Sequence, residues 1–253
     1  MCEDCGVLLP ESGWEPVNAG ESDTEVFRRG AVYAKCCGPA GVGELLAERD
    51  RVEWLSGTSI PGAAVLDWIE GDEGAALLTS TVPGVAAIDL PWSDKLVDSF
   101  ALTLRAFHEL PLESCPFERR LDDVVGQAED VVRRGAVNPD FLTDEWRLVQ
   151  PEELLARLHA ELPSVREKAD LVVCHGDACL PNFLFDPDTL DCTGAIDVGR
   201  LGIADRYADL ALVRAQLQDE WSIDADRFFA TYGLTPDPQR LAFYHLLDPL
   251  TWG

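Results

Sequence analysis

The pattern of apolar and polar positions along the chain changes near Ser93. Before it, apolar residues stand in short runs with glycine-bearing turns between them, which is typical of β-strands. Alternation at 31–34 and apolar runs at 63–66 and 75–81 predict strands of an antiparallel sheet, with one helix at about 44–55. After it, apolar residues recur at three- and four-residue steps, which predicts helices. These helices are expected to begin at Ser93 and Pro151 and to cover 121–134, 205–220, 224–232 and 238–248.

The segment 171–212, inside the helical part, departs from this periodicity. Its apolar start at 171–173 is short enough to be a buried strand. Residues 183–185 and 193–196 predict two further strands. The sequence Asp-Pro-Asp-Thr at 186–189 predicts the turn that joins them into a hairpin.

The hairpin is expected to bring polar side chains together, because its two ends meet. Asn182 precedes the first strand, Asp197 follows the second, and Asp177 lies on the loop before them. Carboxylate and amide oxygens are ligands that suit Mg²⁺. We therefore expect Asn182 and Asp197 to hold Mg²⁺ against the phosphates of ATP, and Asp177 to accept the proton of an attacking hydroxyl. Protein kinases use the same order, an Asp, an Asn five residues later and then a metal-binding Asp.

Lys35 stands out because the chain has three lysines among twenty basic residues. It closes the alternating strand at 31–34, where a half-buried cation needs a counter-charge. Kinases pair such a lysine with a helix glutamate so that the lysine reaches the nucleotide phosphates. On the helix at 44–55, Glu48 is the expected partner, while Glu44 and Glu53 are expected to face water.

A turn from Asn18 to Ser22 lies between two expected strands, just ahead of the strand that ends in Lys35. Its backbone N–H groups could lie over phosphates, so Ser22 is a candidate nucleotide contact. A simple connecting turn is the alternative.

The motif HGDACLPN at 175–182, followed by IDVGRLGIADRYADLAL at 196–212, resembles the aminoglycoside 3'-phosphotransferases. These are antibiotic-resistance kinases with a protein-kinase-like fold. The resemblance implies an α+β, two-lobed chain. A nucleotide-binding lobe at 1–82, an antiparallel sheet plus a helix, would be followed by a mainly helical catalytic and substrate-binding lobe at 83–253. The hinge is expected at about 79–84. The implied reaction is transfer of the ATP γ-phosphate to the 3'-hydroxyl of an aminoglycoside.

The resemblance also implies contacts to the nucleotide base. Ser80 and Val82, at the hinge, would meet the adenine edge through their backbone groups, and Tyr33 would stack on the ring. In the family the glutamate that pairs with the lysine lies six residues before a Trp-Leu, as Glu48 does before Trp54.

A cationic aminoglycoside needs carboxylates around its acceptor hydroxyl. The family's acidic substrate loop aligns with Asp144 and Glu145, and two further candidates by position are the Asp219–Glu220 pair and Asp248. Arg200 would lie at the mouth of the site, to contact phosphate or to order the carboxylates. The family commonly has an acidic residue where this chain has Pro249. The alternatives are therefore a kinase of the same fold for another small hydroxylated amine or antibiotic, and a non-catalytic nucleotide-binding module.

The net charge of −26 argues against a nucleic-acid partner and favours a cationic ligand, although an acidic surface adapted to salt is an equal explanation. No apolar run reaches membrane-spanning length, and the N-terminus has no basic stretch typical of a signal peptide. A cytoplasmic consumer of ATP, monomeric or weakly dimeric, is the expectation. Cys2 and Cys5 form a C-x-x-C without a second ligand pair for zinc.

Several polar residues are expected to support the structure and to take no part in chemistry. His175 would orient the catalytic loop by hydrogen bonding. Asp205 and Asp209 would cap a helix and brace the backbone of that loop. The remaining histidines, His108, His159 and His245, lie in helical stretches and belong to no recognisable metal-binding pattern.

Overall fold

The computed structural model describes residue 9 and residues 12–17 and 24–253. The chain forms two compact units. The first contains residues 1–90 and 181–200, and the second contains residues 91–180 and 201–253. The hairpin at 181–200 therefore belongs to the same unit as the N-terminal sheet. The assignment of nucleotide binding to residues 1–82 and of catalysis and substrate binding to residues 83–253 stays a prediction.

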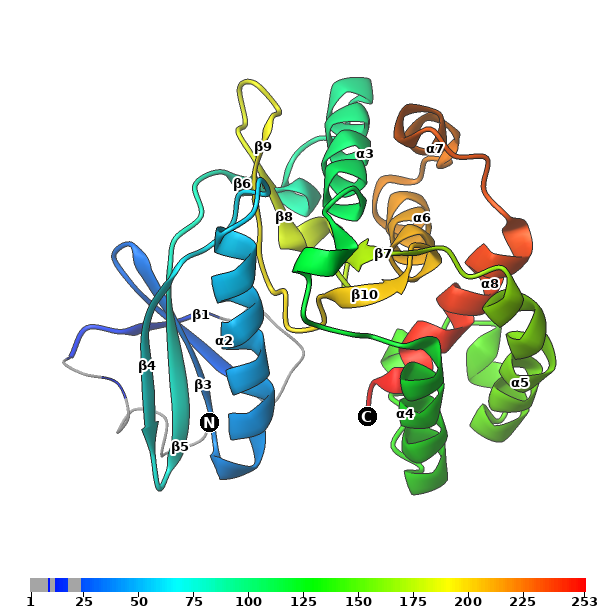
Figure 1. The fold of residues 1–253 in the computed structure, drawn as a ribbon, viewed down its shortest axis with the longest axis horizontal. Helices are drawn as coiled ribbons and strands as arrows, with labels where there is room; N and C mark the ends of the chain where they lie inside the picture. Colours follow the sequence, from blue (N-terminus) through cyan, green and yellow to red (C-terminus); the bar gives the residue numbers. More distant parts are fainter. Residues whose placement is uncertain (1–8, 10–11, 18–23) are drawn as a thin grey trace. The chain divides into compact units, whose positions relative to one another are not determined.

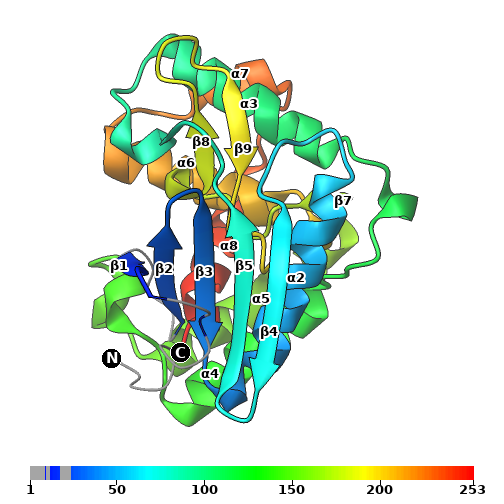
Figure 2. The same cartoon turned by 90° about the vertical axis from the view of Figure 1, so that its left-hand side faces the viewer.

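The first unit is built on a five-stranded antiparallel sheet in the order β1-β2-β3-β5-β4. Figure 2 shows the strands in this order, and Figures 1 and 2 show helix α2 (Val42–Ser56) alongside the sheet. The strands are β1 (Glu15–Val17), β2 (Glu25–Arg29), β3 (Val32–Cys37), β4 (Val65–Gly71) and β5 (Gly74–Ser80). The predicted helix at 44–55 and the predicted strands are thus confirmed, with ends that differ by a few residues.

Alternation along β3 decides which side chains meet α2. Ala34 and Cys36 belong to a core cluster on one face, with Ala76 and Leu78 of β5. Cys37 belongs to the cluster on the other face, where Leu45 of α2 packs. Because successive strand residues point to opposite faces, Lys35 shares its face with Cys37 and hence with α2.

The hairpin of the first unit forms as predicted. Strand β8 (Phe183–Phe185) pairs with β9 (Cys192–Ala195) and, on its other edge, with the short strand β6 (Val85–Ala86). In the turn, Asp186 Oδ1 accepts hydrogen bonds from the backbone N–H groups of Asp188 (2.9 Å) and Thr189 (2.8 Å). An aspartate that bonds its own following backbone is a recognised turn former, which is why this stretch could be assigned from sequence.

The second unit packs helices around a two-stranded ribbon of β7 (Leu171–Cys174) and β10 (Gly202–Asp205). Helix α3 contacts α7, and α8 contacts both α5 and α6. The helices are α3 (Asp94–His108), α4 (Leu121–Arg134), α5 (Pro151–Glu167), α6 (Tyr207–Trp221), α7 (Asp226–Tyr232) and α8 (Pro238–Leu247). Short 3₁₀ turns are η1 (Pro39–Gly41), η2 (Ala87–Asp89), η3 (Leu112–Ser114), η4 (Pro139–Phe141), η5 (Trp146–Leu148), η6 (Leu180–Asn182) and η7 (Asp248–Thr251).

The ends of the helices follow local chemistry. Ser93 caps α3 by accepting a hydrogen bond from Leu96 N–H, as predicted. The helix expected to begin at residue 205 begins at Tyr207, because Gly202–Asp205 pairs with β7 as strand β10. Asp205 then accepts from Tyr207 N–H at the start of α6, at 3.2 Å. In the described part of the chain, no helix has the length and apolar character needed to cross a membrane.

Candidate functional site

The ammonium group of Lys35 lies between two carboxylates in the first unit. Its Nζ is 2.8 Å from Glu48 Oε2 on α2 and 3.1 Å from Asp197 Oδ1 on the loop after β9. The Lys35 and Glu48 side chains are 21% and 13% exposed, whereas Asp197 is 51% exposed. The pairing of Lys35 with Glu48 that was expected from sequence is present, and Glu44 and Glu53 are exposed, as expected.

The charges of this group support one another. Burial alone would lower the pKa of Lys35, but the negative charges of Glu48 and Asp197 outweigh it and raise that pKa, so Lys35 stays cationic. Burial raises the pKa of Glu48, while Lys35 works against that rise. The result is a fixed cation next to an accessible carboxylate.

Asp197 and Asn182 lie at the same end of the hairpin. The N–H of Ile196 donates to the carbonyl of Asn182 at 2.9 Å, so the residue before Asp197 is bonded to Asn182 itself. Asp197 has a positive φ of 56°, a conformation that costs energy for residues other than glycine but is tolerated best by Asp and Asn. A carboxylate and an amide at adjoining positions suit a hard cation such as Mg²⁺. The donor set therefore fits the predicted metal, whose binding stays a prediction.

The predicted contacts to the nucleotide base come from the first unit. Tyr33 lies on β3 two residues before Lys35 and on the same face, with the Arg28 guanidinium 5.6 Å from its ring centre. Ser80 ends β5, and its Oγ accepts from Ala64 N–H at 2.9 Å. Val82 is buried. It packs against Gly194 so closely that a Cβ atom added at Gly194 would lie 2.5 Å from Val82 Cγ1. Ser22 lies outside the described residues.

Between Ser80 and Val82, the hydroxyl of Thr81 is buried and has no hydrogen-bond partner in the described part of the chain. A buried hydroxyl without a partner costs about 1–3 kcal/mol.

The loop His175-Gly176-Asp177 follows β7 in the second unit and is held by Asp209 of α6. The fully buried Asp209 carboxylate accepts from the backbone N–H groups of His175 (2.7 Å) and Gly176 (2.8 Å). The N–H of Asp177 donates to His175 Nδ1 at 3.3 Å. Asp209 and His175 therefore brace the loop as expected from the sequence.

A chain of buried groups supports Asp209 in turn. His108 Nε2 lies 3.0 Å from Asp209 Oδ2, and His108 Nδ1 lies 2.7 Å from the Tyr232 hydroxyl. Arg206 donates to the same hydroxyl at 2.9 Å. Burial alone would raise the pKa of Asp209, but the hydrogen bond and charge of His108 and the Gly176 N–H outweigh it and lower that pKa. Since a carboxylate only accepts hydrogen bonds, His108 Nε2 is the donor to Asp209.

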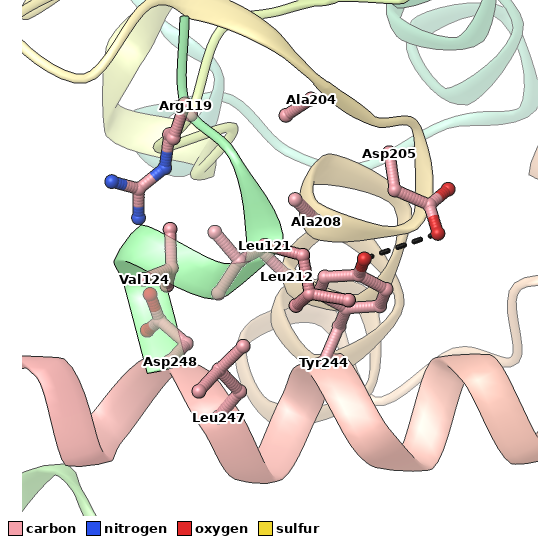
Figure 3. Close-up of a pocket in the computed structure, with 11 residues that line it drawn as sticks. Arg119, Leu121, Val124, Ala204, Asp205, Ala208, Leu212, Tyr244, Leu247 and Asp248 are labelled. Atoms are coloured by element: carbon pink, nitrogen blue, oxygen red, sulfur yellow. Dashed lines mark hydrogen bonds between the residues drawn. The ribbon is translucent and has the colours of Figure 1, made fainter. Parts of the chain in front are cut away.

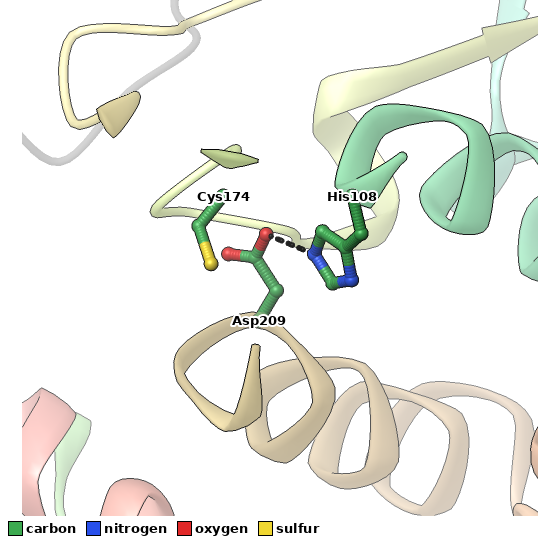
Figure 4. Close-up of side chains that lie close together, drawn as sticks. All are labelled: His108, Cys174 and Asp209. Atoms are coloured by element: carbon green, nitrogen blue, oxygen red, sulfur yellow. Dashed lines mark hydrogen bonds and ion pairs between the residues drawn. The ribbon is translucent and has the colours of Figure 1, made fainter. Parts of the chain in front are cut away.

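Cys174, His108 and Asp209 lie close together (Figure 4). Each is a residue type that can bind a metal ion, and their potential ligand atoms lie within 4.8 Å of one another. Sequence analysis did not predict this grouping. Both nitrogens of His108 are already hydrogen-bonded. Burial raises the pKa of the Cys174 thiol well above its ordinary value, whereas zinc binds the thiolate. The group acts as a hydrogen-bonded brace, in line with the structural role expected for His108.

The carboxylates expected to bind the acceptor lie in the second unit. Asp144 and Glu145 are exposed before η5, with Asp144 Oδ1 3.2 Å from Arg147, and Asp219 and Glu220 are exposed near the end of α6. Asp248 begins η7 and lines a pocket with Arg119 (Figure 3), and Gly176 also lines this pocket. The pocket has a volume of about 30 Å³, enough for one or two water molecules. Arg200, which belongs to the first unit, is half-buried.

Sequence reasoning also missed two contacts made by predicted site residues. One joins Lys35 to Asp197, which lie 162 residues apart in the chain. The other is local: Cys179 Sγ lies 3.1 Å from Asp177 Oδ1. Cys179 lies inside the HGDACLPN motif, two residues after Asp177, and this spacing could have suggested the contact.

Comparisons with known proteins agree with this geometry. A family model described as the phosphotransferase enzyme family matches residues 13–244. Streptomycin 3''-kinase of Streptomyces griseus is 52% identical over 98% of this chain and 97% of that protein. An aminoglycoside 3'-phosphotransferase of Streptomyces fradiae is 42% identical over 94% of this chain and 95% of that protein.

A solved structure extends the likeness to three dimensions. Aminoglycoside phosphotransferase APH(3'')-Id from Streptomyces rimosus, in complex with ADP and streptomycin, is 50% identical and superposes with a TM-score of 0.87. The match covers 95% of this chain and 93% of that one. The predicted α+β, protein-kinase-like fold is thereby confirmed.

The Lys35 group makes a prediction about stability and pH. In Lys35→Met, the buried Glu48 carboxylate loses its cation, and we expect the free energy of unfolding to fall by about 1–3 kcal/mol at pH 8. Folding raises the pKa of Glu48, and loss of Lys35 raises it further. The deficit is therefore full above that raised pKa and shrinks as the pH falls through it toward the ordinary glutamate value of about 4.3. Urea unfolding at pH 8 and pH 4.5 measures this difference.

Two further variants control the experiment. Lys35→Met combined with Glu48→Gln should recover part of the lost stability at pH 8, because no charge is then stranded. Lys95→Met, at an exposed lysine in the first turn of α3, should change stability by less than about 0.5 kcal/mol at either pH. A deficit in Lys35→Met that does not vary with pH would contradict the assignment.

The His108 brace makes a second prediction. His108→Leu removes a donor from the buried Asp209, so we expect a loss of about 1–3 kcal/mol in unfolding free energy. Native-state hydrogen exchange should show faster exchange of the His175 and Gly176 amides, which Asp209 holds. His159→Leu, at an exposed histidine 3.2 Å from Glu129, serves as the control and should leave both measurements unchanged. Unchanged loop exchange in a folded His108→Leu protein would show that His108 does not support the loop.

Proposed function

The chain belongs to the phosphotransferase enzyme family and, within it, to the aminoglycoside phosphotransferases, and on this basis we propose that it transfers the γ-phosphate of ATP to the 3''-hydroxyl of streptomycin. The observation that carries the choice of acceptor is the 52% identity to a streptomycin 3''-kinase over 98% of the chain. The sequence motifs led to the 3'-hydroxyl. Because the likeness to a 3''-kinase is greater, we propose the 3''-hydroxyl as the acceptor. Phosphorylation there would inactivate streptomycin and so confer resistance to it.

In the proposed mechanism the first unit holds the nucleotide. Lys35, kept cationic by Glu48, binds the α- and β-phosphates. Tyr33, Ser80 and Val82 contact the base. The predicted role of Ser22 at the phosphates is retained.

Asn182 and Asp197 would hold Mg²⁺, which neutralises charge on the β- and γ-phosphates when bound. Asp197 is already ion-paired to Lys35. The same carboxylate would therefore link the phosphate-binding lysine to the metal.

Asp177 acts as the base in the transfer step. The acceptor hydroxyl gives its proton to the Asp177 carboxylate while its oxygen bonds to the γ-phosphorus. The bond from that phosphorus to the bridging β-phosphate oxygen breaks, and ADP leaves. The transition state is loose, so most of the acceleration comes from alignment and from charge neutralisation.

We propose the carboxylates of the second unit as contacts for the cationic acceptor, and Arg200 as a contact to phosphate or as the residue that orders them. The net charge of −26 would speed the encounter with a cation. The proposed acceptor contacts are Asp144, Glu145, Asp219, Glu220 and Asp248. The enzyme is proposed to act in the cytoplasm, where ATP is available, as a monomer or weak dimer.

The C-terminal segment supports an acceptor other than that of the 3'-phosphotransferases. Pro249 stands where that family commonly has an acidic residue, and Pro249, Leu250 and Thr251 are buried. Gln127 of α4 donates to the carbonyl of Thr251 at 3.0 Å. These tail residues are occupied in packing, which is consistent with a different acceptor-binding surface.

A second candidate is phosphorylation of the 3'-hydroxyl of kanamycin-type aminoglycosides. It is favoured by the 42% identity, over 94% of this chain, to an aminoglycoside 3'-phosphotransferase. The two candidates differ in acceptor and in the position of the new phosphate, so one experiment separates them.

We expect a coupled ADP-release assay with Mg-ATP to give turnover with streptomycin and little with kanamycin or neomycin. Phosphorus–proton correlation NMR of the product should place the phosphate on the 3''-oxygen, through its coupling to the proton on the 3''-carbon. Turnover with kanamycin in the absence of streptomycin activity would establish the 3' candidate. Measurable ATP binding without turnover on any of the three would favour another small hydroxylated amine, or a non-catalytic module.

Asp177→Asn tests the proposed base. We expect kcat with streptomycin to fall at least about 100-fold, because general-base catalysis contributes on the order of 10²–10⁴. Affinity for ATP, measured by calorimetry, should stay within about threefold. The matched control is Asp191→Asn, at an exposed carboxylate beside the hairpin turn, which should leave kcat unchanged. Near-full turnover in Asp177→Asn would remove Asp177 from the mechanism.

A further inference from the structure

We infer that Cys179 is a positioning residue whose thiol fixes the orientation of the Asp177 carboxylate. This inference rests on the proposed function of Asp177 as the base. The contact is direct: Cys179 Sγ donates to Asp177 Oδ1 at 3.1 Å. Both residues belong to the second unit and to the same loop.

The backbone reinforces the contact. The N–H of Cys179 also donates to the carbonyl of Asp177, at 2.8 Å, so Cys179 bonds both the backbone and the side chain of Asp177. Ala178 and Leu180, on either side of Cys179, are fully buried. Leu180 N–H lies 3.4 Å from the side-chain oxygen of Gln216 on α6. The loop therefore presents the thiol to the carboxylate from a fixed position.

The thiol is the donor in this pair. A carboxylate accepts hydrogen bonds, so the sulfur must carry its proton. Burial raises the pKa of Cys179 well above its ordinary value, and the charge and hydrogen bond of Asp177 raise it further. Cys179 is therefore a neutral S–H group at physiological pH, and it is poorly suited to act as a nucleophile.

A neutral donor is appropriate beside this base. A carboxylate turns about its Cβ–Cγ bond, and a donor on Oδ1 limits that rotation. In-line transfer depends on such alignment, and small displacements of the reacting groups are costly in rate. A lysine at this position would also orient Asp177, but its charge would repel a cationic acceptor. The thiol restrains the base without adding positive charge.

The first test compares three variants of the full chain in the streptomycin assay. We expect Cys179→Ala to lower kcat about three- to tenfold, the range for one lost hydrogen bond, with KM for ATP within about twofold of the wild type. Cys179→Ser keeps a donor and should recover at least about half of the wild-type kcat. Cys192→Ala, at a half-buried thiol on β9, is the control and should retain wild-type kcat.

Two outcomes would overturn the inference. One is a kcat for Cys179→Ala within about 1.5-fold of the wild type. The other is Cys179→Ser no more active than Cys179→Ala in protein of equal stability, since thiol packing would then explain the effect.

The second test measures the contact between Cys179 and Asp177 through the reactivity of the thiol, independently of catalytic turnover. Asp177→Asn removes the charge that raises the pKa of Cys179, so the thiolate fraction at pH 8.5 should increase. Alkylation of Cys179 by iodoacetamide, followed by peptide mass spectrometry, should be at least about threefold faster than in the wild type, with Cys192 as the internal reference. Equal rates at Cys179 would show that the two groups do not interact in solution.

The two tests also separate this inference from the proposed function. If Asp177→Asn retains turnover, the base assignment fails, whatever Cys179 does. If Asp177→Asn is inactive and Cys179→Ala is fully active, the base stands and the positioning role fails.

Discussion

Water stabilises charge, and burial removes that stabilisation, so every buried ion in this protein needs partners that restore it. Each compact unit contains a place where this constraint organises the surrounding chain. In the first unit, Lys35 remains cationic because Glu48 and Asp197 flank it. In the second, Asp209 remains anionic because His108 and two backbone N–H groups converge on it. Both ions hold segments of the sequence motifs in place: the loop after β9 in one unit, and the loop after β7 in the other.

Much of this arrangement could be predicted because its causes are local. The hairpin was recognisable because Asp186 forms its turn through its own neighbours, and α3 because Ser93 caps it. Glu48 was singled out by helical position and by the kinase pattern. Strand β10 was missed because four residues carry little periodicity, and Gly202–Asp205 is a strand through its pairing with β7. The pairing of Lys35 with Asp197 and the brace of His108 join distant segments, and no local pattern encodes them.

The acceptor contacts illustrate a different limit. With 46 acidic residues in the chain, a carboxylate carries little information by itself, and the fold leaves Asp144, Glu145, Asp219 and Glu220 on exposed surfaces. The change from the 3'- to the 3''-hydroxyl came from whole-chain likeness, which is 52% identity to a streptomycin 3''-kinase and 42% to an aminoglycoside 3'-phosphotransferase. Reaction type was therefore readable from short motifs, whereas regiochemistry was not.

Helix α2 is fastened to the sheet in two independent ways. The first is apolar: Leu45, Val52 and Leu55 of the helix are buried. The second is the ion pair between Glu48 of the helix and Lys35 of β3. Displacing the helix would expose apolar surface and separate an ion pair at once, so α2 and the sheet should move and unfold as one cooperative body. A loss of either attachment would therefore be felt first as faster local opening of this unit, before any loss of its secondary structure.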